Sequence, residues 1–165
     1  MGHIKFYPQL QSLRLVDMAK LISACLLGVK CRYDGTSARE PKLLKLAKGE
    51  RLIPICPEQL GGLPTPRDPA WIVGGDGSDV LKGEAKVISR NGSDVTENFL
   101  IGAKETLRVA KLFGAKRAVL KARSPSCGCG TIRVPHSFDE LKDGDGVTAA
   151  LLEKNGIRVI TEEDL

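Results

Sequence analysis

Short apolar runs alternate with amphipathic stretches along most of the chain. Four apolar runs bounded by turn residues predict strands buried on both faces, at 20–28, 51–57, 117–122 and 157–161. Three stretches with apolar residues at helical spacing predict helices, at 41–47, 94–113 and 145–155. Strands and helices that alternate in this way favour right-handed crossovers and a parallel sheet. The pattern therefore predicts an α/β fold, a Rossmann-like three-layer sandwich with a mostly parallel sheet.

Single residues refine the first half of this outline. Pro54 removes one donor from the hydrogen-bond ladder of the second strand, which suits an edge position in a doubly wound sheet of strand order 2-1-3-4. Ser37 and Glu40 have the spacing of a capping box, which predicts that they cap the first helix and that Pro41 lies in its first turn.

Residues 58–94 form a glycine- and proline-rich insertion in the pattern. Two short apolar segments within it, 71–73 and 85–89, predict a small hairpin. The glycine-rich residues 74–77 are interpreted as a turn, because they lack the spacing and the directly following helix of a phosphate loop. An insertion of this length in a compact domain is usually functional, and we expect it to form a wall or lid.

The composition is that of one soluble domain. With 165 residues, 42% of them apolar, the chain can bury a sizeable core. We assign residues 18–165 to a single α/β domain and interpret residues 1–17 as a leader or an expression remnant, because Met18 is a natural start for the first core strand. The chain has no stretch of 18 apolar residues, and residues 1–17 lack a secretory signal. Both observations predict a cytoplasmic protein with no membrane partner.

The net charge of +5 favours acidic partners such as phosphates or nucleic acids. The basic residues form no run of five, however, and only 4% of the residues are aromatic, so the sequence does not indicate a stacking surface for single-stranded nucleic acid. A small anionic ligand is the simpler interpretation. The sequence does not indicate an oligomeric state.

The five cysteines do not suggest a disulfide framework, because their number is odd and thiols stay reduced in the cytosol. Cys25, Cys56 and Cys127 each lie near the carboxyl end of a different predicted strand, where open parallel sheets bind their ligands. In the order 2-1-3-4 these strands are neighbours, roughly 4.7–4.9 Å apart. The three thiols can therefore converge on one object about the size of a cubane cluster.

The available ligands indicate what that object is. Zinc takes four closed ligands or commonly includes histidine, and neither His3 nor His136 lies near a cysteine. An iron-sulfur cluster held by thiolates fits better, and three ligands leave one iron open for a substrate. Cys31, in the loop after the first strand, and Cys129, two residues beyond Cys127, are each a candidate fourth ligand, a redox partner or a buried bystander.

Three blocks carry a resemblance to a known family. They are Ser-Ala-Cys-Leu-Leu-Gly at 23–28 with Arg-Tyr-Asp-Gly at 32–35, the segment 56–67, which begins Cys-Pro-Glu-Gln-Leu-Gly-Gly, and Ala-Arg-Ser-Pro-Ser-Cys-Gly at 122–128. From about Met18 to the C-terminus, the chain resembles a family of small bacterial proteins, formerly a domain of unknown function, that includes the thiouracil desulfidases.

The resemblance implies a 4Fe-4S cluster with one open iron site, held by three cysteines that are matched by Cys25, Cys56 and Cys127. It implies a non-redox desulfidase that converts the C=S of a thiolated pyrimidine (thiouracil, thiouridine or its nucleotide) to C=O. Glu58 and Ser124 occupy positions suited to proton transfer. Each also has a structural interpretation, Glu58 as a carboxylate that caps loop amides beside Cys56 and Ser124 as part of a tight Ser-Pro-Ser turn.

Further residues are candidates for substrate binding. Ser126 is a candidate hydrogen-bond partner, with the same turn as its alternative. Arg32, Arg67 and Arg123 are candidates for a substrate phosphate, which a guanidinium binds through two hydrogen bonds, and an ion-paired surface arginine is the alternative for each. A small thiolated pyrimidine is the expected substrate, and thiolated tRNA stays open. Two other functions also stay open, a non-catalytic iron-sulfur or metal-binding protein and an RNA-associated accessory protein.

Overall fold

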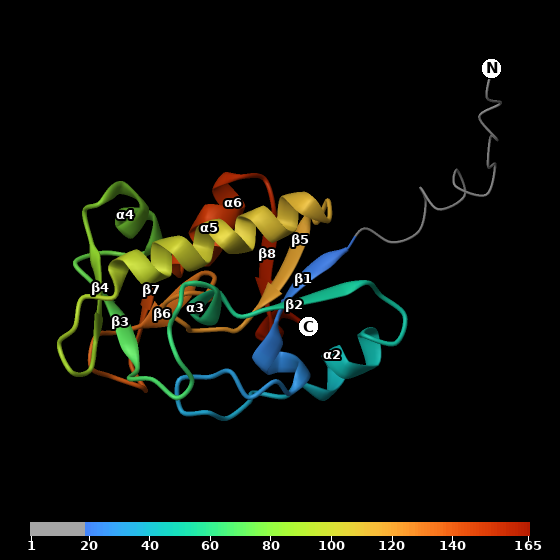
Figure 1. The fold of residues 1–165 in the computed structure, drawn as a ribbon, viewed down its shortest axis with the longest axis horizontal. Coiled ribbons are helices and arrows are strands. Elements are labelled where there is room, and N and C mark those ends of the chain that lie inside the picture. The colour runs from blue at the N-terminus through green and yellow to red at the C-terminus, as the bar shows by residue number, and fades with distance from the viewer. Residues whose placement is uncertain (1–18) are drawn as a thin grey trace, which may run out of the picture.

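Four parallel strands form the central sheet of the structure, a computed structural model that describes residues 19–165 (Figure 1). The strands are β1 (Lys20–Ser23), β2 (Leu52–Ile55), β5 (Arg117–Leu120) and β8 (Arg158–Thr161). Their order is β2-β1-β5-β8, and every neighbouring pair is parallel. This is the predicted order 2-1-3-4, with the Pro54 strand at an edge. The interpretation of residues 1–17 lies outside the described residues.

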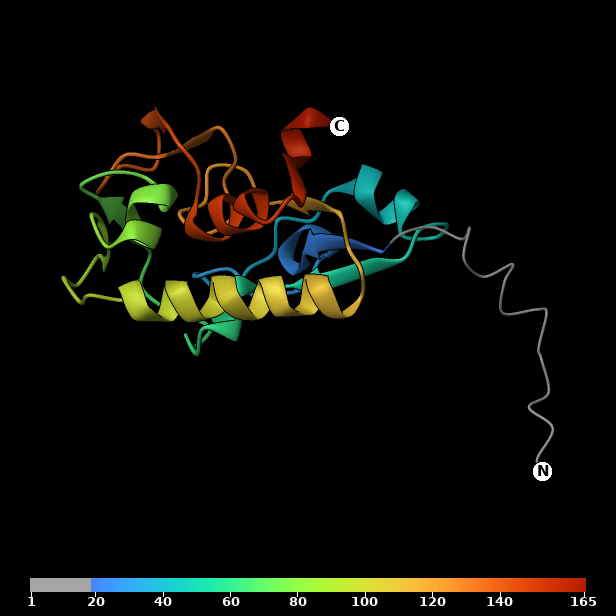
Figure 2. The same cartoon turned by 90° about the horizontal axis from the view of Figure 1, so that it is seen from above.

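Helices cover both faces of the sheet, as Figure 2 shows. α5 (Thr96–Leu112) and α6 (Val147–Lys154) pack on one face, and α2 (Pro41–Leu46) lies on the opposite face. Successive side chains of β1 point to opposite faces. Leu21 joins the core under α5 and α6, whereas Ile22 joins the core under α2. The predicted three-layer α/β fold is confirmed.

The insertion folds into two short helices and a hairpin. Its elements are α3 (Pro57–Leu60), β3 (Ala70–Val73), α4 (Gly77–Lys82) and β4 (Lys86–Ser89). β3 and β4 pair antiparallel, which confirms the predicted hairpin. The interpretation of residues 74–77 as a turn without a following helix is wrong, because Asp76 caps α4 and accepts from the amides of Ser78 and Asp79 at 2.8 and 3.2 Å. α4 has only six residues, too few to show an apolar stripe in the sequence.

A second hairpin lies in the region 131–143, where the apolar pattern predicts no element. Its strands, β6 (Thr131–Arg133) and β7 (Leu141–Asp143), pair antiparallel. Both hairpins lie beside the central sheet, and α5 runs along the sheet toward β4 (Figure 1). The chain ends in a 3-10 helix, η3 (Glu162–Asp164). No helix within residues 19–165 has the length and apolar character needed to cross a membrane.

The first strand is shorter than its apolar run. β1 ends at Ser23, and the 3-10 helix η2 (Ala24–Leu27) follows, so Cys25 lies in η2 and not in the strand. Gly28 closes η2 at φ 98°, a left-handed conformation that glycine adopts without strain, and its amide donates to the Cys25 carbonyl at 3.1 Å. Most of η2 is buried, which is why its sequence continues the apolar run of the strand.

α2 begins at Pro41 and not at the predicted capping box. Its N-cap is Glu40, whose carboxylate accepts from the amide of Lys42 at 3.1 Å. A helix begun at Ser37 would require a helical conformation at Glu40, which the ring of the following proline disfavours. Proline is favoured at the first helical position, so the helix starts there.

Candidate active site

A cavity lies at the carboxyl edge of the sheet. Residues that follow β1, β2 and β5 line it, together with parts of both hairpin regions. Four cysteines are among the lining residues: Cys25, Cys31, Cys56 and Cys127. The structure thus brings the three expected ligands to one cavity and adds Cys31 to them.

The short helix α3 determines the position of Cys56. Cys56 is its N-cap residue, directly after β2, and Pro57 is its first helical residue. α3 packs so closely on α5 that a Cβ atom on Gly102 would lie 1.9 Å from the Pro57 carbonyl oxygen. Since only glycine permits this approach, α5 fixes α3 and therefore also Cys56.

The ligand loop, residues 121–130, leads from β5 to β6 and presents Cys127. Within it, Ser124 Oγ accepts hydrogen bonds from the amides of Ser126 and Cys127, both at 3.1 Å. From outside it, the first turn of α6 donates to the carbonyls of Pro125 and Ser126, both at 2.9 Å. The loop carbonyls thereby accept from helix amides that have no partner within the helix. The ligand loop is thus held by the Ser124 hydroxyl from within and by the first turn of α6 from outside.

Ser23, the last residue of β1, is buried beside Cys127. Its hydroxyl accepts from the Lys121 amide at 2.9 Å and donates to Cys127 Sγ at 3.5 Å. Contacts of this kind orient a metal ligand. Ser23 was not among the predicted site residues, although a polar residue inside a buried apolar run was a signal for it.

Glu58 lies in the first turn of α3 and lines the cavity as one half of an ion pair. Arg67 Nε is 2.6 Å from Glu58 Oε2, and the two side chains are 7% and 18% exposed. Within residues 19–165 no backbone amide donates to the Glu58 carboxylate, so it does not act there as a loop cap. The pair presents a carboxylate to the cavity beside Cys56.

The other candidate substrate-binding residues differ in their position relative to the cavity. Arg32 lines the cavity. Ser126 is buried outside the lining, and its hydroxyl lies 3.0 Å from that of Thr148. Arg123 is also outside the lining and pairs with Glu163 at 2.7 Å. Only Arg32 of these three residues is therefore in contact with the cavity.

Aromatic side chains form one wall of the cavity, and none of them was among the predicted site residues. Tyr33, Trp71 and Phe138 all line the cavity. The ring centroids of Trp71 and Phe138 are 5.7 Å apart, and those of Tyr33 and Phe138 are 6.1 Å apart. They come from three separate segments, so no local sequence pattern marks them.

The environment of the cavity raises the pKa of three thiols. The hydrogen bond with the Cys25 thiol, followed by burial, raises the pKa of Cys31 to about 11. The hydrogen bond with Cys31, followed by burial, raises the pKa of Cys56. Burial raises the pKa of Cys127 to about 12. Because a thiol must lose its proton to bind a metal, metal binding here would release protons.

The spacing of the expected ligands suits an object larger than one ion. Thiolates around a tetrahedral zinc, with bonds of about 2.3 Å, lie about 3.8 Å apart. Within residues 19–165, Cys25, Cys56 and Cys127 do not form a group whose sulfur atoms all lie within 4.8 Å of one another. The three thiols therefore do not form a ready tetrahedral zinc site, and thiolates are the ligands that hold iron-sulfur clusters.

Comparison with known proteins identifies the family. The model of the 2-thiouracil desulfurase family matches residues 21–164. The chain belongs to this family. The uncharacterized protein YbbK of Bacillus subtilis (strain 168) is 48% identical over 145 residues, which are 88% of this chain and 96% of that protein. A solved structure of the 4Fe-4S-dependent thiouracil desulfidase TudS matches with a TM-score of 0.79 at 38% identity, over 90% of this chain and 93% of that one.

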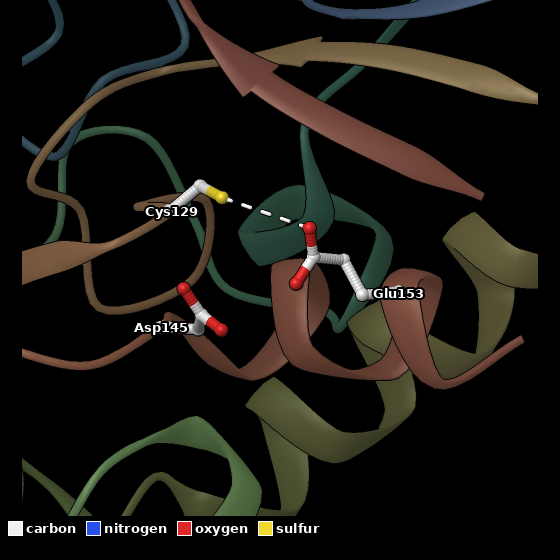
Figure 3. Close-up of side chains that lie close together, drawn as sticks. All are labelled: Cys129, Asp145 and Glu153. Atoms are coloured by element: carbon white, nitrogen blue, oxygen red, sulfur yellow. Dashed lines mark hydrogen bonds between the residues drawn. The ribbon is translucent and has the colours of Figure 1, made fainter. Parts of the chain in front are cut away.

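This member of the desulfurase family is an enzyme, and its fifth cysteine, Cys129, lies apart from the cavity. Cys129 faces Asp145, before α6, and Glu153, on α6, and one ligand atom from each lies within 4.8 Å of the others (Figure 3). Cys129 Sγ is 3.9 Å from Glu153 Oε1, and burial, followed by the charge of Glu153, raises the pKa of Cys129 to about 11. This thiol is not placed to complete the cavity's ligand set.

Proposed function

We propose that this enzyme is an iron-sulfur-dependent desulfidase that converts the C=S of thiouracil, thiouridine or its nucleotide to C=O without net redox change. The convergence of Cys25, Cys56 and Cys127 on one cavity, which Glu58 and Ser124 also line, carries the proposal. One water is consumed and one hydrogen sulfide is released. The water oxygen forms a bond to the ring carbon, the carbon-sulfur bond breaks, and the sulfur leaves as hydrogen sulfide with two protons.

Cys25, Cys56 and Cys127 would hold a 4Fe-4S cluster in this cavity. A cluster bound by three thiolates supplies a sulfur-binding Lewis acid that makes the thiocarbonyl carbon more electrophilic. The three thiols do not form a close group around a single ion, which agrees with this assignment. So does the similarity to TudS, which is described as 4Fe-4S-dependent.

Glu58 is the proposed general base. Arg67 holds its Oε2 at 2.6 Å, whereas its Oε1 has no hydrogen-bond partner among residues 19–165. A carboxylate within hydrogen-bond reach of a water can take a proton from it and return that proton to a ring nitrogen or to the departing sulfur. The free oxygen of Glu58 is therefore assigned to this transfer.

Ser124 is the proposed hydrogen-bond donor to the substrate. Its oxygen accepts from two backbone amides, which uses both lone pairs and leaves the hydroxyl hydrogen free to donate. Hydrogen bonds that are linked in this way polarise one another, so the two amides strengthen the hydroxyl as a donor. Ser124 also lines the cavity, where a carbonyl or nitrogen of the ring can accept.

The remaining lining residues suggest how the substrate is held. Tyr33, Trp71 and Phe138 supply an aromatic wall for a planar pyrimidine. Arg32 is the candidate for the phosphate of a nucleotide substrate. We assign Ser126 to the support of the ligand loop, because its hydroxyl already bonds to Thr148.

Anaerobic reconstitution followed by a sulfide-release assay tests the proposal. The protein is expected to bind on the order of four irons per chain, with broad absorbance near about 400 nm. It should release sulfide from 2-thiouracil, 4-thiouridine or 4-thiouridine monophosphate. Cys56→Ser should lose the cluster, and Cys129→Ser, a matched control outside the cavity, should keep it. A protein that holds iron but releases sulfide from none of these, nor from thiolated tRNA, would contradict the proposal and favour a non-catalytic iron-sulfur protein.

A further inference from the structure

The guanidinium of Arg67 makes four hydrogen bonds, two to residues that line the cavity and two to residues of the loop behind it. Nε donates to Glu58 Oε2 at 2.6 Å, and Nη2 donates to the Cys31 carbonyl at 3.1 Å. Nη1 donates to the Pro64 carbonyl at 3.1 Å and to Thr65 Oγ1 at 3.2 Å. Four of its five N–H groups thus face protein acceptors, and the side chain is only 7% exposed. This geometry argues against the expected role in binding a substrate phosphate.

These acceptors join three segments of the wall: the loop after η2, the start of α3 and the loop after α3. The backbone amide of Arg67 adds a bond to the Tyr33 carbonyl at 2.8 Å. The Cys31 carbonyl, which accepts from Arg67, is also 3.7 Å from Cys56 Sγ. One guanidinium therefore fixes Glu58 relative to the backbone beside a proposed cluster ligand.

We infer that Arg67 is a positioning residue that acts through Glu58. This inference rests on the proposed function, in which Glu58 is the general base. The pair holds one carboxylate oxygen on the protein and leaves the other for water, so the side chain cannot swing away from the cavity. Both partners are largely buried, and solvent therefore screens their attraction little. A misplacement of about 1 Å in such a group is enough to lower a rate about 100-fold.

A double-mutant cycle on the reconstituted enzyme tests this role. With 2-thiouracil as the substrate, Arg67→Lys should lower kcat about 100-fold and change KM less than about threefold. In a Glu58→Gln background, the same substitution should lower kcat by no more than about threefold, because the group it positions is already lost. Thr65→Ala, which removes one contact with Arg67 and one with Gln59 but not the contact between Arg67 and Glu58, is the matched control and should keep kcat within about twofold.

The thermal unfolding midpoints of the same proteins give a measurement that does not depend on activity. Arg67→Lys should lower Tm by roughly 2–4 °C in the wild-type background and clearly less beside Glu58→Gln. If the wild-type protein released no sulfide, the proposed function would fail, while this second cycle would still report whether the two side chains are coupled.

Three results would overturn the inference. Equal losses of kcat in both backgrounds would show that Arg67 acts independently of Glu58. A raised KM for 4-thiouridine monophosphate with an unchanged kcat would assign Arg67 to the substrate phosphate. Loss of iron from both Arg67→Lys and Arg67→Gln would show a role in folding the site and not in positioning Glu58.

Discussion

The hydroxyl of Ser23 connects the central sheet to the ligand loop. It accepts from the Lys121 amide at 2.9 Å, and its single hydrogen is directed at Cys127 Sγ, 3.5 Å away. Lys121 and Cys127 are thus tied to the same atom of β1. The orientation of Cys127 is therefore determined partly by a residue 104 positions earlier in the chain.

Replacing Ser23 by alanine should lower the free energy of unfolding by about 1–3 kcal/mol, because the Lys121 amide loses its acceptor in a buried place. Denaturant unfolding followed by circular dichroism measures this loss. Ser93→Ala, at an exposed serine, should change the same free energy by less than about 0.5 kcal/mol. Equal stabilities of the two variants would show that the Ser23 contacts contribute nothing.

Cys31 lines the cavity beside the proposed ligands, and its carbonyl is 3.7 Å from Cys56 Sγ. We expect Cys31→Ser to retain on the order of four irons per chain after anaerobic reconstitution, because the three other cavity cysteines stay in place. Iron content and the visible spectrum measure this. If Cys31→Ser lost as much iron as Cys25→Ser, Cys31 would have to be counted as a fourth ligand.

The sequence predicted the convergence of the cavity cysteines better than it predicted the residues that support them. Cys25, Cys56 and Cys127 were expected to converge, because the carboxyl ends of neighbouring parallel strands share one edge. The role of Arg67 could not be read in the same way, since two of its acceptors are the backbone carbonyls of Cys31 and Pro64. Because every residue has a backbone carbonyl, the sequence does not show which carbonyls accept hydrogen bonds from a given side chain.

At the scale of elements, the contact between α3 and α5 connects the core to the site. Gly102→Ala should lower the free energy of unfolding by about 2–4 kcal/mol and reduce iron loading, because the new methyl would displace the helix that carries Glu58 and has Cys56 as its N-cap. Denaturant unfolding and iron analysis measure the two effects. The control is Gly49→Ala, where an added Cβ meets nothing within 4 Å. A stable, fully loaded Gly102→Ala protein would contradict this account.

Asp94 joins the β3–β4 hairpin to α5. It accepts from the Thr96 amide at 3.0 Å and pairs with Lys86 at 3.0 Å, and the bonds to Thr96 lower its pKa to about 2. Because the pKa of Asp94 is lower in the folded protein than its ordinary value of 3.8, the carboxylate stabilises the fold at pH values above 3.8. This contribution to the free energy of unfolding is lost as the pH falls through about 2. Because the group is exposed, Asp94→Ala should cost only up to about 1 kcal/mol at pH 7. Unfolding curves should differ at pH 7 and converge near about pH 2; a constant difference would contradict this explanation.

Long elements and strand order were predictable, and short elements were not. The buried strands and α5 have clear apolar patterns, and Pro54 marked the edge strand. α3 and α4 have four and six residues, less than two helical turns each, so their patterns cannot be distinguished from those of turns. η2 was read as strand because a buried 3-10 turn is as apolar as the strand before it.

At the scale of the molecule, the proposed cluster would connect segments far apart in the chain. A group that binds only the folded state stabilises it by mass action. We therefore expect the cluster-loaded protein to unfold about 5–10 °C above the protein stripped of iron by a chelator, as measured by anaerobic scanning calorimetry. Chelator treatment should leave the Tm of Cys56→Ser unchanged. Identical midpoints for the loaded and stripped wild-type protein would contradict this prediction.

The hydrogen bonds between α6 and the ligand loop also bear on when a cluster could be inserted during synthesis of the chain. Cys25 and Cys56 emerge from the ribosome well before Cys127, and the carbonyls of the ligand loop gain their donors, Val147 and Thr148, only after α6 has been made. A protein that delivers clusters would meet three oriented thiols only on a chain that has been made as far as α6. We therefore expect cluster insertion to follow the synthesis of α6.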